Sequence, residues 1–372
     1  MHDFVSLTVA SVQAETADAV CIGLVPPTAH ADAFRFRPGQ HLALRAMIDG
    51  DEVRRTYSIC SGPDDGTLSV AIKRISGGVF SNWACNAIRP GMTIESMPPS
   101  GRFVLADTPG NNRHVLAFAA GAGITPIMAM ADHAMRRQPA TRFTLVYGNR
   151  DLASIMFRER LEDLKDAFID RLTLVHVLSR NDDSESPLLE GRITAEKVAA
   201  LSRHLFQPAE VDDVFLCGPG SMIRDVRNAL FAAGFPREHV HHEFFAAGGG
   251  AYRSASGSSP TAAAAPAAIV EPAAPAASLL RTEIVAVLDG QRHRFMAEPG
   301  ETLVGAALRA GVRAPYACKG GMCSTCRARV VEGNVAMRVN YSLEPWEVER
   351  GFVLTCQAVA ETPRVIIDYD QM

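Results

Sequence analysis

Half of the eight cysteines lie near the end of the chain, in a spacing that restricts how this part can fold. The pattern is C-x4-C-x2-C followed by a more distant fourth cysteine, and its members are Cys318, Cys323, Cys326 and Cys356. One tight loop can supply three thiolates, so the fourth must come from elsewhere in the same domain. Gly320 and Gly321 favour such a loop, because both can adopt positive φ and bring backbone N–H groups towards bound sulfur. We therefore predict a metal-binding loop in a small domain.

Two kinds of metal site are compatible with thiolate ligands. Zinc sites usually combine two C-x2-C pairs, and this segment contains only one, Cys323 and Cys326. The complete pattern is similar to that of plant-type [2Fe–2S] ferredoxins, in which four thiolates hold two irons. Residues 282–372 thus resemble a ferredoxin domain, which implies an α+β fold of the β-grasp type, with a helix expected at 301–310. The four cysteines are the expected iron ligands, and zinc is the less favoured alternative.

The segment before this domain has the composition of a linker. Residues 246–281 are rich in alanine, proline, glycine and serine, without apolar periodicity. Pro266, Pro272 and Pro275 would interrupt any helix that the alanines could form. A flexible coil of this length has an r.m.s. span of about 30–35 Å. We expect this linker to let the small domain move between two docking partners.

Two further domains are predicted before the linker. Residues 1–106 contain short alternating apolar segments separated by turn sequences such as Asp49-Gly50, a pattern typical of an antiparallel β-barrel. In residues 107–245, buried-strand segments alternate with helical ones, and the strand at 114–120 precedes a helix at 126–138. This alternation predicts an α/β domain with a parallel sheet. The expected fold is therefore multi-domain.

A glycine-rich turn joins that first strand to its helix. Gly121 and Gly123 would let the backbone approach a pyrophosphate, and the helix N-terminus would present free N–H groups to it. We expect Thr125 to cap the helix and Pro126 to occupy its first position. The third glycine of the Rossmann fingerprint is absent, so this GAGITP segment alone does not identify a dinucleotide site.

Four short segments resemble the ferredoxin–NADP reductase family. They are Arg55-Thr56-Tyr57-Ser58, the turn 77–81, the GAGITP segment and Cys217-Gly218-Pro219. Singly each has a simpler explanation: Arg55 would be a surface arginine and Cys217 a small buried apolar residue. Their common order makes coincidence a poor explanation. The resemblance implies that the barrel binds FAD and that the α/β domain binds a nicotinamide nucleotide.

The resemblance also implies roles for single residues. Arg55 would pair with the FAD pyrophosphate, Tyr57 would stack on the isoalloxazine, and Ser58 would lie near the edge that accepts hydride. Tyr57, Ser58 and Cys217 are the expected catalytic residues. The other expected contacts with flavin or nicotinamide come from Gly78, Ser81, Gly121, Gly123, Thr125, Cys217, Gly218, Pro219, Glu243 and Phe245.

Two positions favour NADPH over NADH. Ser179 and Arg180, after the strand 172–177, match the pair that holds the 2′-phosphate in NADPH-using relatives, whereas NADH-using relatives often carry an acid there. Arg150 would supply a second cation, with a solvated surface arginine as the alternative. The histidines 239, 241 and 242 suggest a metal site at first, but we expect them to flank a strand.

Charge and hydropathy exclude several classes of function. The formal net charge of −4 offers no basic face for nucleic acid. No apolar run approaches the length of a membrane span, and the N-terminus lacks the features of a signal peptide, so we expect a cytoplasmic protein without a membrane partner. In that compartment, cysteines are expected to be reduced or metal-bound.

Longer stretches extend the resemblance to the reductase components of aromatic-compound oxygenases. Examples are RTYSICS at 55–61 and NYSLEPWEVERGFVLTCQA at 340–358. The resemblance implies an enzyme that takes hydride from NADPH and passes single electrons through FAD and the cluster to a multi-subunit diiron oxygenase. The alternative from another class is a redox-sensing interaction module, although a sensor has no need of a site for hydride entry.

Overall fold

The computed structural model describes residues 4–107, 112–180, 186–245 and 281–371. The chain divides into two compact units, His2–Ala247 and Gly248–Met372. The predicted linker lies outside the described residues except for its last position. Among the described helices, none has both the length and the hydropathy needed to cross a membrane.

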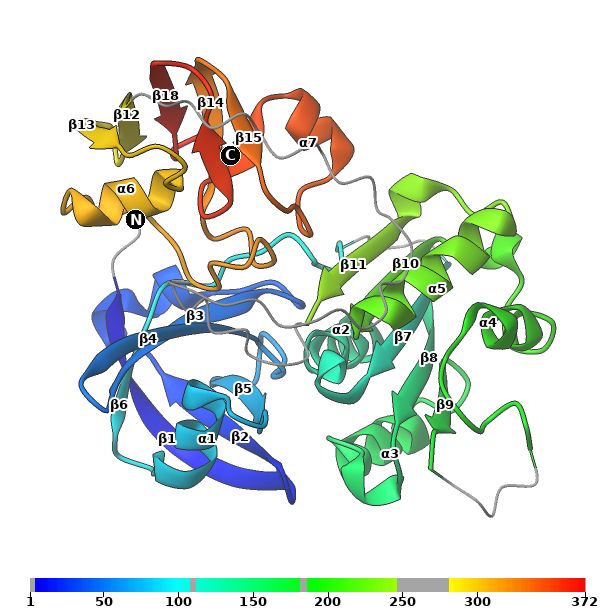
Figure 1. Cartoon of the computed structure of the whole chain (residues 1–372). Helices are drawn as coiled ribbons and strands as arrows, with labels where there is room; N and C mark the ends of the chain where they lie inside the picture. Colours follow the sequence, from blue (N-terminus) through cyan, green and yellow to red (C-terminus); the bar gives the residue numbers. More distant parts are fainter. Residues whose placement is uncertain (1–3, 108–111, 181–185, 246–280, 372) are drawn as a thin grey trace. The chain divides into compact units, whose positions relative to one another are not determined.

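An antiparallel sheet forms the first part of the chain (Figure 1, blue). Its strands are β1 (Val5–Thr16), β2 (Ala19–Val25), β3 (His41–Ile48), β4 (Asp51–Ser58), β5 (Leu68–Lys73) and β6 (Thr93–Ser96). Their order is β4-β3-β6-β1-β2-β5, and a bridge between Ile59 and Val70 joins the continuation of β4 to β5. Buried Leu7 and Val9 alternate with exposed neighbours along β1, as expected for a strand with one face in a core. The predicted antiparallel fold is confirmed.

A tight turn, a 3-10 helix and one α-helix connect strands of this sheet. Asp49 and Gly50 turn β3 into β4 with φ of 52° and 87°, the two positive values that a type I′ hairpin requires. A 3-10 helix, η1 (Thr28–Phe34), lies between β2 and β3. Helix α1 (Val79–Ala87) follows β5 and buries Phe80 and Ala84 in the core of the barrel.

A parallel sheet with helices follows. The strands are β7 (Arg113–Ala120), β8 (Thr141–Asn149), β9 (Leu172–Leu178), β10 (Asp213–Gly218) and β11 (Val240–Phe244), in the order β11-β10-β7-β8-β9. The helices are α2 (Ile124–Arg137), α3 (Arg158–Ala167), α4 (Ala195–Ser202) and α5 (Gly220–Ala232). The described residues of this part also form the short 3-10 segments η2 (Gly121–Gly123), η3 (Leu152–Ser154), η4 (Pro208–Glu210) and η5 (Arg237–His239).

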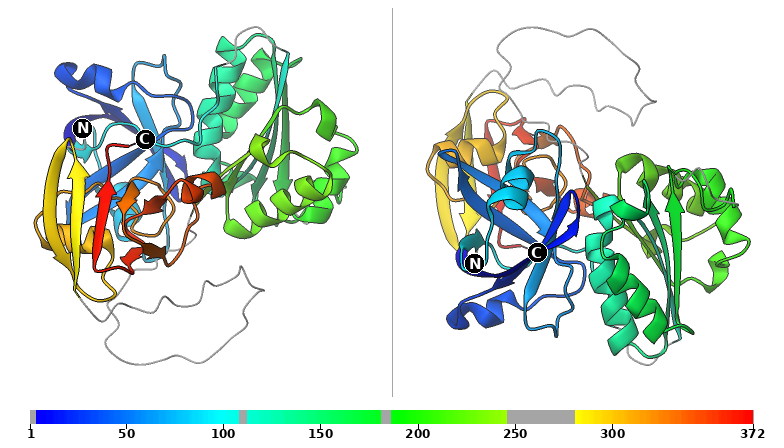
Figure 2. Two further views of the ribbon diagram at one scale, coloured as in Figure 1. Left: turned by 90° about the horizontal axis from the view of Figure 1, so that it is seen from above. Right: turned by 90° about the horizontal axis from the view of Figure 1, so that it is seen from below.

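Both faces of this sheet are covered, which explains why its central strands β7 and β10 are almost entirely buried (Figure 2). Ile127 of α2 and Leu161 of α3 pack in one core cluster, and Val198 of α4 and Ile223 of α5 pack in another. From β7 the chain adds β8 and β9 on one side, and it then returns to place β10 and β11 on the other side of β7. The carboxyl ends of β7 and β10 therefore lie side by side at a topological switch point. Ligands of open α/β sheets bind at such points.

The second unit contains a mixed five-stranded sheet, order β13-β12-β18-β14-β16, and a two-stranded sheet, β15-β17. The strands are β12 (Thr282–Leu288), β13 (Gln291–Ala297), β14 (Arg327–Glu332), β15 (Val335–Met337), β16 (Phe352–Leu354), β17 (Ala358–Ala360) and β18 (Arg364–Asp368). The helices are α6 (Leu303–Arg309) and α7 (Pro345–Glu349). Thr302 caps α6, and Leu303 and Ala307 bury its inner face. The predicted helix and the α+β fold are confirmed.

Candidate flavin, nicotinamide and iron–sulfur sites

Three predicted residues from distant parts of the sequence meet at the carboxyl end of β10. Ser58 ends β4, and its Oγ donates a hydrogen bond to Oε2 of Glu243 at 3.2 Å. Cys217 lies opposite Glu243 in the parallel register of β10 and β11. Burial raises the pKa of the Cys217 thiol, and the Glu243 carboxylate adds to this effect. Cys217 therefore offers a small neutral thiol rather than a nucleophilic thiolate.

His41 belongs to the same group of residues, although the sequence did not indicate it. Its Nδ1 lies 3.6 Å from Oε1 of Glu243, and its Nε2 lies 3.3 Å from Oγ of Ser100. The His41 side chain is buried at the start of β3. In the sequence this histidine is one residue of an apolar strand, and its partner is far along the chain, so no local pattern could have identified it.

Arg55 and Tyr57 lie two residues apart on β4 and therefore project from the same face of the strand. The Tyr57 ring lies 5.5 Å from that of Phe80 in α1, centroid to centroid. Burial raises the pKa of Tyr57, so its hydroxyl stays protonated. Arg55 is exposed, and its Nη1 donates to the carbonyl of Arg54 at 2.7 Å. An exposed guanidinium beside an aromatic ring fits one phosphate and the ring system of a flavin nucleotide.

Gly78 and Ser81 form the turn that begins α1. Ser81 Oγ accepts a hydrogen bond from the N–H of Ile75 at 3.1 Å and donates to the carbonyl of Gly78 at 3.4 Å. A Cβ at Gly78 would lie 2.6 Å from Ser81 Oγ, so a larger residue there would displace the serine hydroxyl from its place in the turn. The hydroxyl of Ser81 is thus engaged within the turn, while no side chain caps the first N–H groups of α1. Those N–H groups, rather than the serine hydroxyl, suit a phosphate.

The GAGITP turn lies directly against the CGP segment. A Cβ on Gly123 would lie only 2.2 Å from the carbonyl oxygen of Cys217, so only glycine fits. Gly121 has a φ of 53°, and Gly218 has a φ of 153° before α5 begins. Phe245 joins this group, because its N–H donates to the carbonyl of Gly218 at 3.4 Å. The N-termini of α2 and α5 thus lie together at the switch point.

The predicted cap of α2 is wrong. The 3-10 turn Gly121–Gly123 continues directly into the helix, whose first residue is Ile124 and whose N-cap is Gly123. Thr125 therefore lies within the first turn, where its Oγ1 donates to the carbonyl of Ala122 at 3.0 Å. Pro126 still occupies the first turn, in which backbone N–H groups have no helical partner.

The residues expected at the 2′-phosphate lie at adjacent strand ends. The N–H of Ser179 donates to the carbonyl of Asn149 at 2.9 Å, and that of Arg180 donates to the carbonyl of Arg150 at 2.7 Å. Both arginine side chains are exposed, and Arg150 Nη2 lies 3.2 Å from Oδ2 of Asp18. Parallel pairing of β8 and β9 thus brings the two predicted cations close together.

The four C-terminal cysteines are arranged as two pairs. A hydrogen bond from the Cys323 thiol, helped by N–H groups of the loop, lowers the pKa of Cys318 to about 5. One of these N–H groups, that of Gly320, lies 3.3 Å from Cys318 Sγ. A hydrogen bond from Cys326 likewise lowers the pKa of Cys356. Two thiol pairs fit two irons with two thiolates each. In the part of the chain that the structure describes, no three His, Cys, Asp or Glu residues surround a single metal position.

The loop conformation differs from the prediction at one glycine. Gly321 has a φ of 75°, and a Cβ there would lie 3.3 Å from the carbonyl oxygen of Val339. Gly320 does not adopt positive φ, so this part of the prediction is wrong. Lys319 and Ser324 adopt it instead, with φ of 51° and 53°. Each of these two residues directly follows a cysteine of the loop, Cys318 or Cys323, so the left-handed positions lie next to two of the expected ligands.

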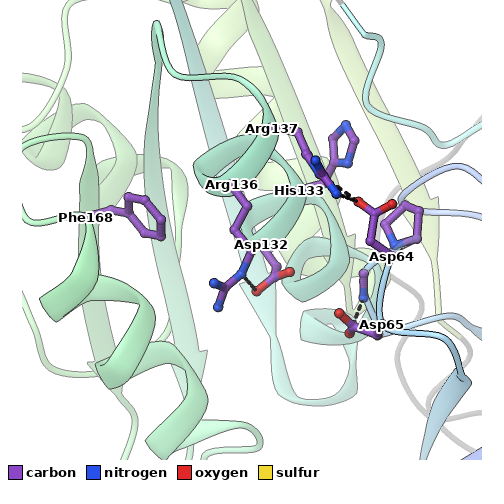
Figure 3. A pocket seen from close by; sticks show the side chains of 9 residues that line it. Asp64, Asp65, Asp132, His133, Arg136, Arg137 and Phe168 are labelled. Atoms are coloured by element: carbon purple, nitrogen blue, oxygen red, sulfur yellow. Dashed lines mark hydrogen bonds and ion pairs between the residues drawn. The ribbon is translucent and has the colours of Figure 1, made fainter.

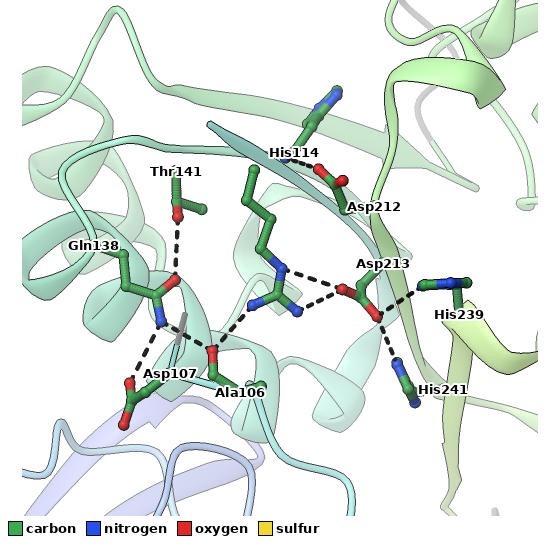
Figure 4. A network of polar contacts seen from close by, with 10 residues as sticks. Ala106, Asp107, His114, Gln138, Thr141, Asp212, Asp213, His239 and His241 are labelled. Carbon is green, nitrogen blue, oxygen red and sulfur yellow. Dashed lines mark hydrogen bonds and ion pairs between the residues drawn. The ribbon is translucent and has the colours of Figure 1, made fainter. Parts of the chain in front are cut away.

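Histidines of η5 and β11 take part in a polar network (Figure 4). The expectation that all three flank a strand is wrong for His241 and His242, which lie within β11, and holds only for His239, which precedes it. Nε2 of His241 lies 2.9 Å from Oδ1 of Asp213, and Nδ1 of His239 lies 3.7 Å from the same oxygen. Arg113 donates from its Nε to Asp213 Oδ2 at 3.1 Å. These contacts tie β7, β10 and β11 together. The contacts with Asp213 therefore give His239 and His241 a structural role in this network.

A cavity of about 330 Å³ lies elsewhere, between the loop 62–65 and α2 (Figure 3). None of the predicted site residues lines it. Its charged groups are paired: Arg137 with Asp64 at 2.7 Å and Arg136 with Asp132 at 3.0 Å. The first of these ion pairs joins the barrel to the α/β domain, so the cavity belongs to a domain contact.

A flavin-type barrel, a nucleotide site at a switch point and paired thiols together define an iron–sulfur flavoprotein oxidoreductase. Three family models match: the oxidoreductase FAD-binding domain over residues 9–105, the oxidoreductase NAD-binding domain over 118–228, and the 2Fe-2S iron-sulfur cluster binding domain over 286–361. The chain belongs to the family of reductase components of oxygenases that combine these three domains. The resemblance stated from the sequence is confirmed.

Relatives match over the whole chain. One subunit of the 1,2-phenylacetyl-CoA epoxidase from Escherichia coli (strain K12) is 42% identical over 380 residues, covering 100% of this chain and 99% of that protein. The ferredoxin reductase component of 3-ketosteroid-9-alpha-monooxygenase from Rhodococcus rhodochrous is 37% identical, with 98% and 97% covered. Phthalate dioxygenase reductase has the same fold, with a TM-score of 0.57 at 21% identity and 98% of both chains covered.

Replacing Tyr57 by alanine is expected to weaken FAD binding. Loss of a stacked aromatic side chain removes about 2 kcal/mol, roughly a 30-fold rise in Kd. The measurement is flavin retained after gel filtration, with Tyr341→Ala as the control, because Tyr341 is an exposed tyrosine of the other unit. Unchanged flavin content in Tyr57→Ala would refute the stacking role.

Proposed function

We propose that this chain transfers electrons from NADPH, through FAD and its [2Fe–2S] cluster, to a multi-subunit diiron oxygenase that epoxidises phenylacetyl-CoA. The observation that carries the proposal is 42% identity, over the full length of both chains, to the phenylacetyl-CoA epoxidase component from Escherichia coli. The absence of disulfides among the eight cysteines is compatible with a cytoplasmic location.

Three of the described residues support the proposed entry of hydride. Bound FAD accepts hydride from a nicotinamide and releases electrons singly, and a [2Fe–2S] cluster carries one electron at a time. Ser58, Cys217 and Glu243 place a hydroxyl, a neutral thiol and a carboxylate at the switch point where the two nucleotides would meet. Ser58 and Cys217 are buried, so water is excluded from this end of the site.

Three cationic or polar groups support NADPH as the electron donor. Arg150, Ser179 and Arg180 lie at adjacent strand ends, and the two arginines are exposed to a ligand. A 2′-phosphate binds best where it meets more than one cation, and arginine can contact it through two N–H groups. NADH lacks this phosphate and would gain nothing from these groups.

The direct test is reconstitution with the purified oxygenase of the phenylacetyl-CoA system. With phenylacetyl-CoA, O₂ and NADPH, the chain is expected to sustain equimolar NADPH consumption and epoxide formation, measured by absorbance and by mass spectrometry. Consumption of NADPH without epoxide, in the presence of an oxygenase shown to be active with its own reductase, would refute the assignment of this partner.

A second candidate is the reductase of another oxygenase, favoured by 37% identity to the 3-ketosteroid system over nearly the whole chain. Parallel reconstitution with that oxygenase distinguishes the two. Steady-state turnover with an artificial acceptor distinguishes a reductase from a redox sensor. A reductase reduces ferricyanide continuously with NADPH, whereas a sensor stops after it has been reduced once.

A further inference from the structure

Arg327 and Glu347 form a buried ion pair next to the cysteine loop. Nε of Arg327 lies 2.9 Å from Oε1 of Glu347. The Glu347 side chain is 0% exposed and that of Arg327 is 15% exposed, while the guanidinium carbon lies 3.6 Å from the centre of the Phe352 ring. A carboxylate this deeply buried is stable as an anion only beside a compensating cation.

The backbone places this pair beside two of the four cluster ligands. Arg327 directly follows Cys326, and it pairs with Leu354 in the ladder of β14 and β16. Thr355, next to the ligand Cys356, donates from its N–H to the carbonyl of Cys326 at 3.0 Å. The charged side chain and the two thiols are therefore held by one hydrogen-bonded piece of sheet. Charges in such a poorly hydrated environment interact more strongly than they would in water.

We propose that Glu347 sets the reduction potential of the [2Fe–2S] cluster by neutralising Arg327. A [2Fe–2S] cluster held by these thiolates would gain one negative charge when it accepts an electron. An uncompensated cation nearby would stabilise the reduced cluster and raise its potential, and an uncompensated anion would lower it. Glu347 is thus a positioning residue that acts through Arg327. The inference rests on the cluster itself and is independent of which oxygenase accepts the electrons.

Glu347 uses one carboxylate oxygen for the ion pair and the other for a hydrogen bond to the backbone, so a substitution can remove its charge and keep that hydrogen bond. Oε2 accepts a hydrogen bond from the N–H of Glu344 at 2.9 Å, which forms the capping box of α7. Glutamine serves in capping boxes as glutamate does, because its side-chain oxygen accepts the same hydrogen bond. Glu347→Gln therefore removes the charge while it keeps the cap.

The test is a redox titration of the purified holoprotein, followed by visible circular dichroism and electron paramagnetic resonance of the cluster. Glu347→Gln is expected to shift the midpoint potential upwards, and Arg327→Gln to shift it downwards. The double variant Arg327→Gln/Glu347→Gln is expected to return close to the wild-type potential. The matched control is Glu283→Gln, which breaks a solvent-exposed ion pair with Arg364 in the same domain and should leave the potential unchanged.

Iron and acid-labile sulfide are measured first, so that only variants with full cluster content are compared. If Glu347→Gln does not assemble a cluster, Arg327→Gln and Arg327→Lys still test the idea, since only the former should lower the potential. Equal potentials in all variants, with a loss of thermal stability alone, would mean a structural ion pair and would overturn the proposal. Shifts of the same sign in both single variants would overturn it as well. Failure of the reconstitution with the oxygenase would not alter any of these potentials.

Discussion

Replacing Cys323 by alanine is expected to remove the cluster and to reduce NADPH-driven cytochrome c reduction to background. Cys323 is buried and forms a hydrogen-bonded pair with Cys318, so its loss would leave three thiolates where a [2Fe–2S] cluster needs four. Reduction of ferricyanide, which the flavin alone can support, is expected to persist. The residues proposed for hydride entry lie in the unit His2–Ala247, whereas Cys323 lies in the other unit.

The measurements are the visible absorption of the cluster, iron content and the rates with the two acceptors. Cys85→Ala is the matched control, because Cys85 belongs to α1 in the unit His2–Ala247 and is not one of the four cysteines of the C-terminal pattern. A normal cluster spectrum in Cys323→Ala would remove the ligand assignment. Loss of ferricyanide reduction together with cytochrome c reduction would show that the two units do not work independently.

Replacing Arg180 by alanine is expected to raise KM for NADPH about 30-fold, because a charge-assisted hydrogen bond to phosphate contributes about 2 kcal/mol. KM for NADH is expected to change little, since NADH carries no 2′-phosphate. Arg150→Ala should have a smaller effect, because Arg150 must first leave its ion pair with Asp18.

The readout is the ratio of kcat/KM for the two nucleotides, with ferricyanide as acceptor so that the cluster does not limit the rate. Arg142→Ala is the control: Arg142 is an exposed arginine at the amino end of β8, the end opposite to Arg150. Equal increases in KM for NADPH and NADH would exclude a 2′-phosphate contact at Arg180.

Several local features could be predicted because nearby residues alone decide them. Asp49-Gly50 forms the expected hairpin turn, since few residue pairs tolerate two positive φ values. The helix expected at 301–310 is present as Leu303–Arg309, because a capping threonine and an apolar face suffice to specify it.

Other features depended on contacts that no local pattern contains. The start of α2 was misplaced because a 3-10 turn and a helix share similar dihedral angles, and tertiary packing of Gly123 against Cys217 selects the conformation. The buried partners of Glu243, Ser58 and His41, come from β4 and β3, which lie far earlier in the chain. From the sequence alone, Arg327 and Glu347 would each be expected at the surface. In the folded domain Glu347 is fully buried and Arg327 is largely buried beside it.

The amino-acid sequence by itself determined the chemistry available to this protein: three thiols in a spacing that one loop can present with a fourth further on, glycines at the turns expected to contact phosphate, and the order of the three domains. These features follow from residue types and short spacings. Only the tertiary structure decided which groups meet, since it joined Ser58, Cys217 and Glu243 and divided the thiols into two pairs. The physical reason is that sheet register and burial, which depend on the whole chain, set both the distances between charges and the solvent around them.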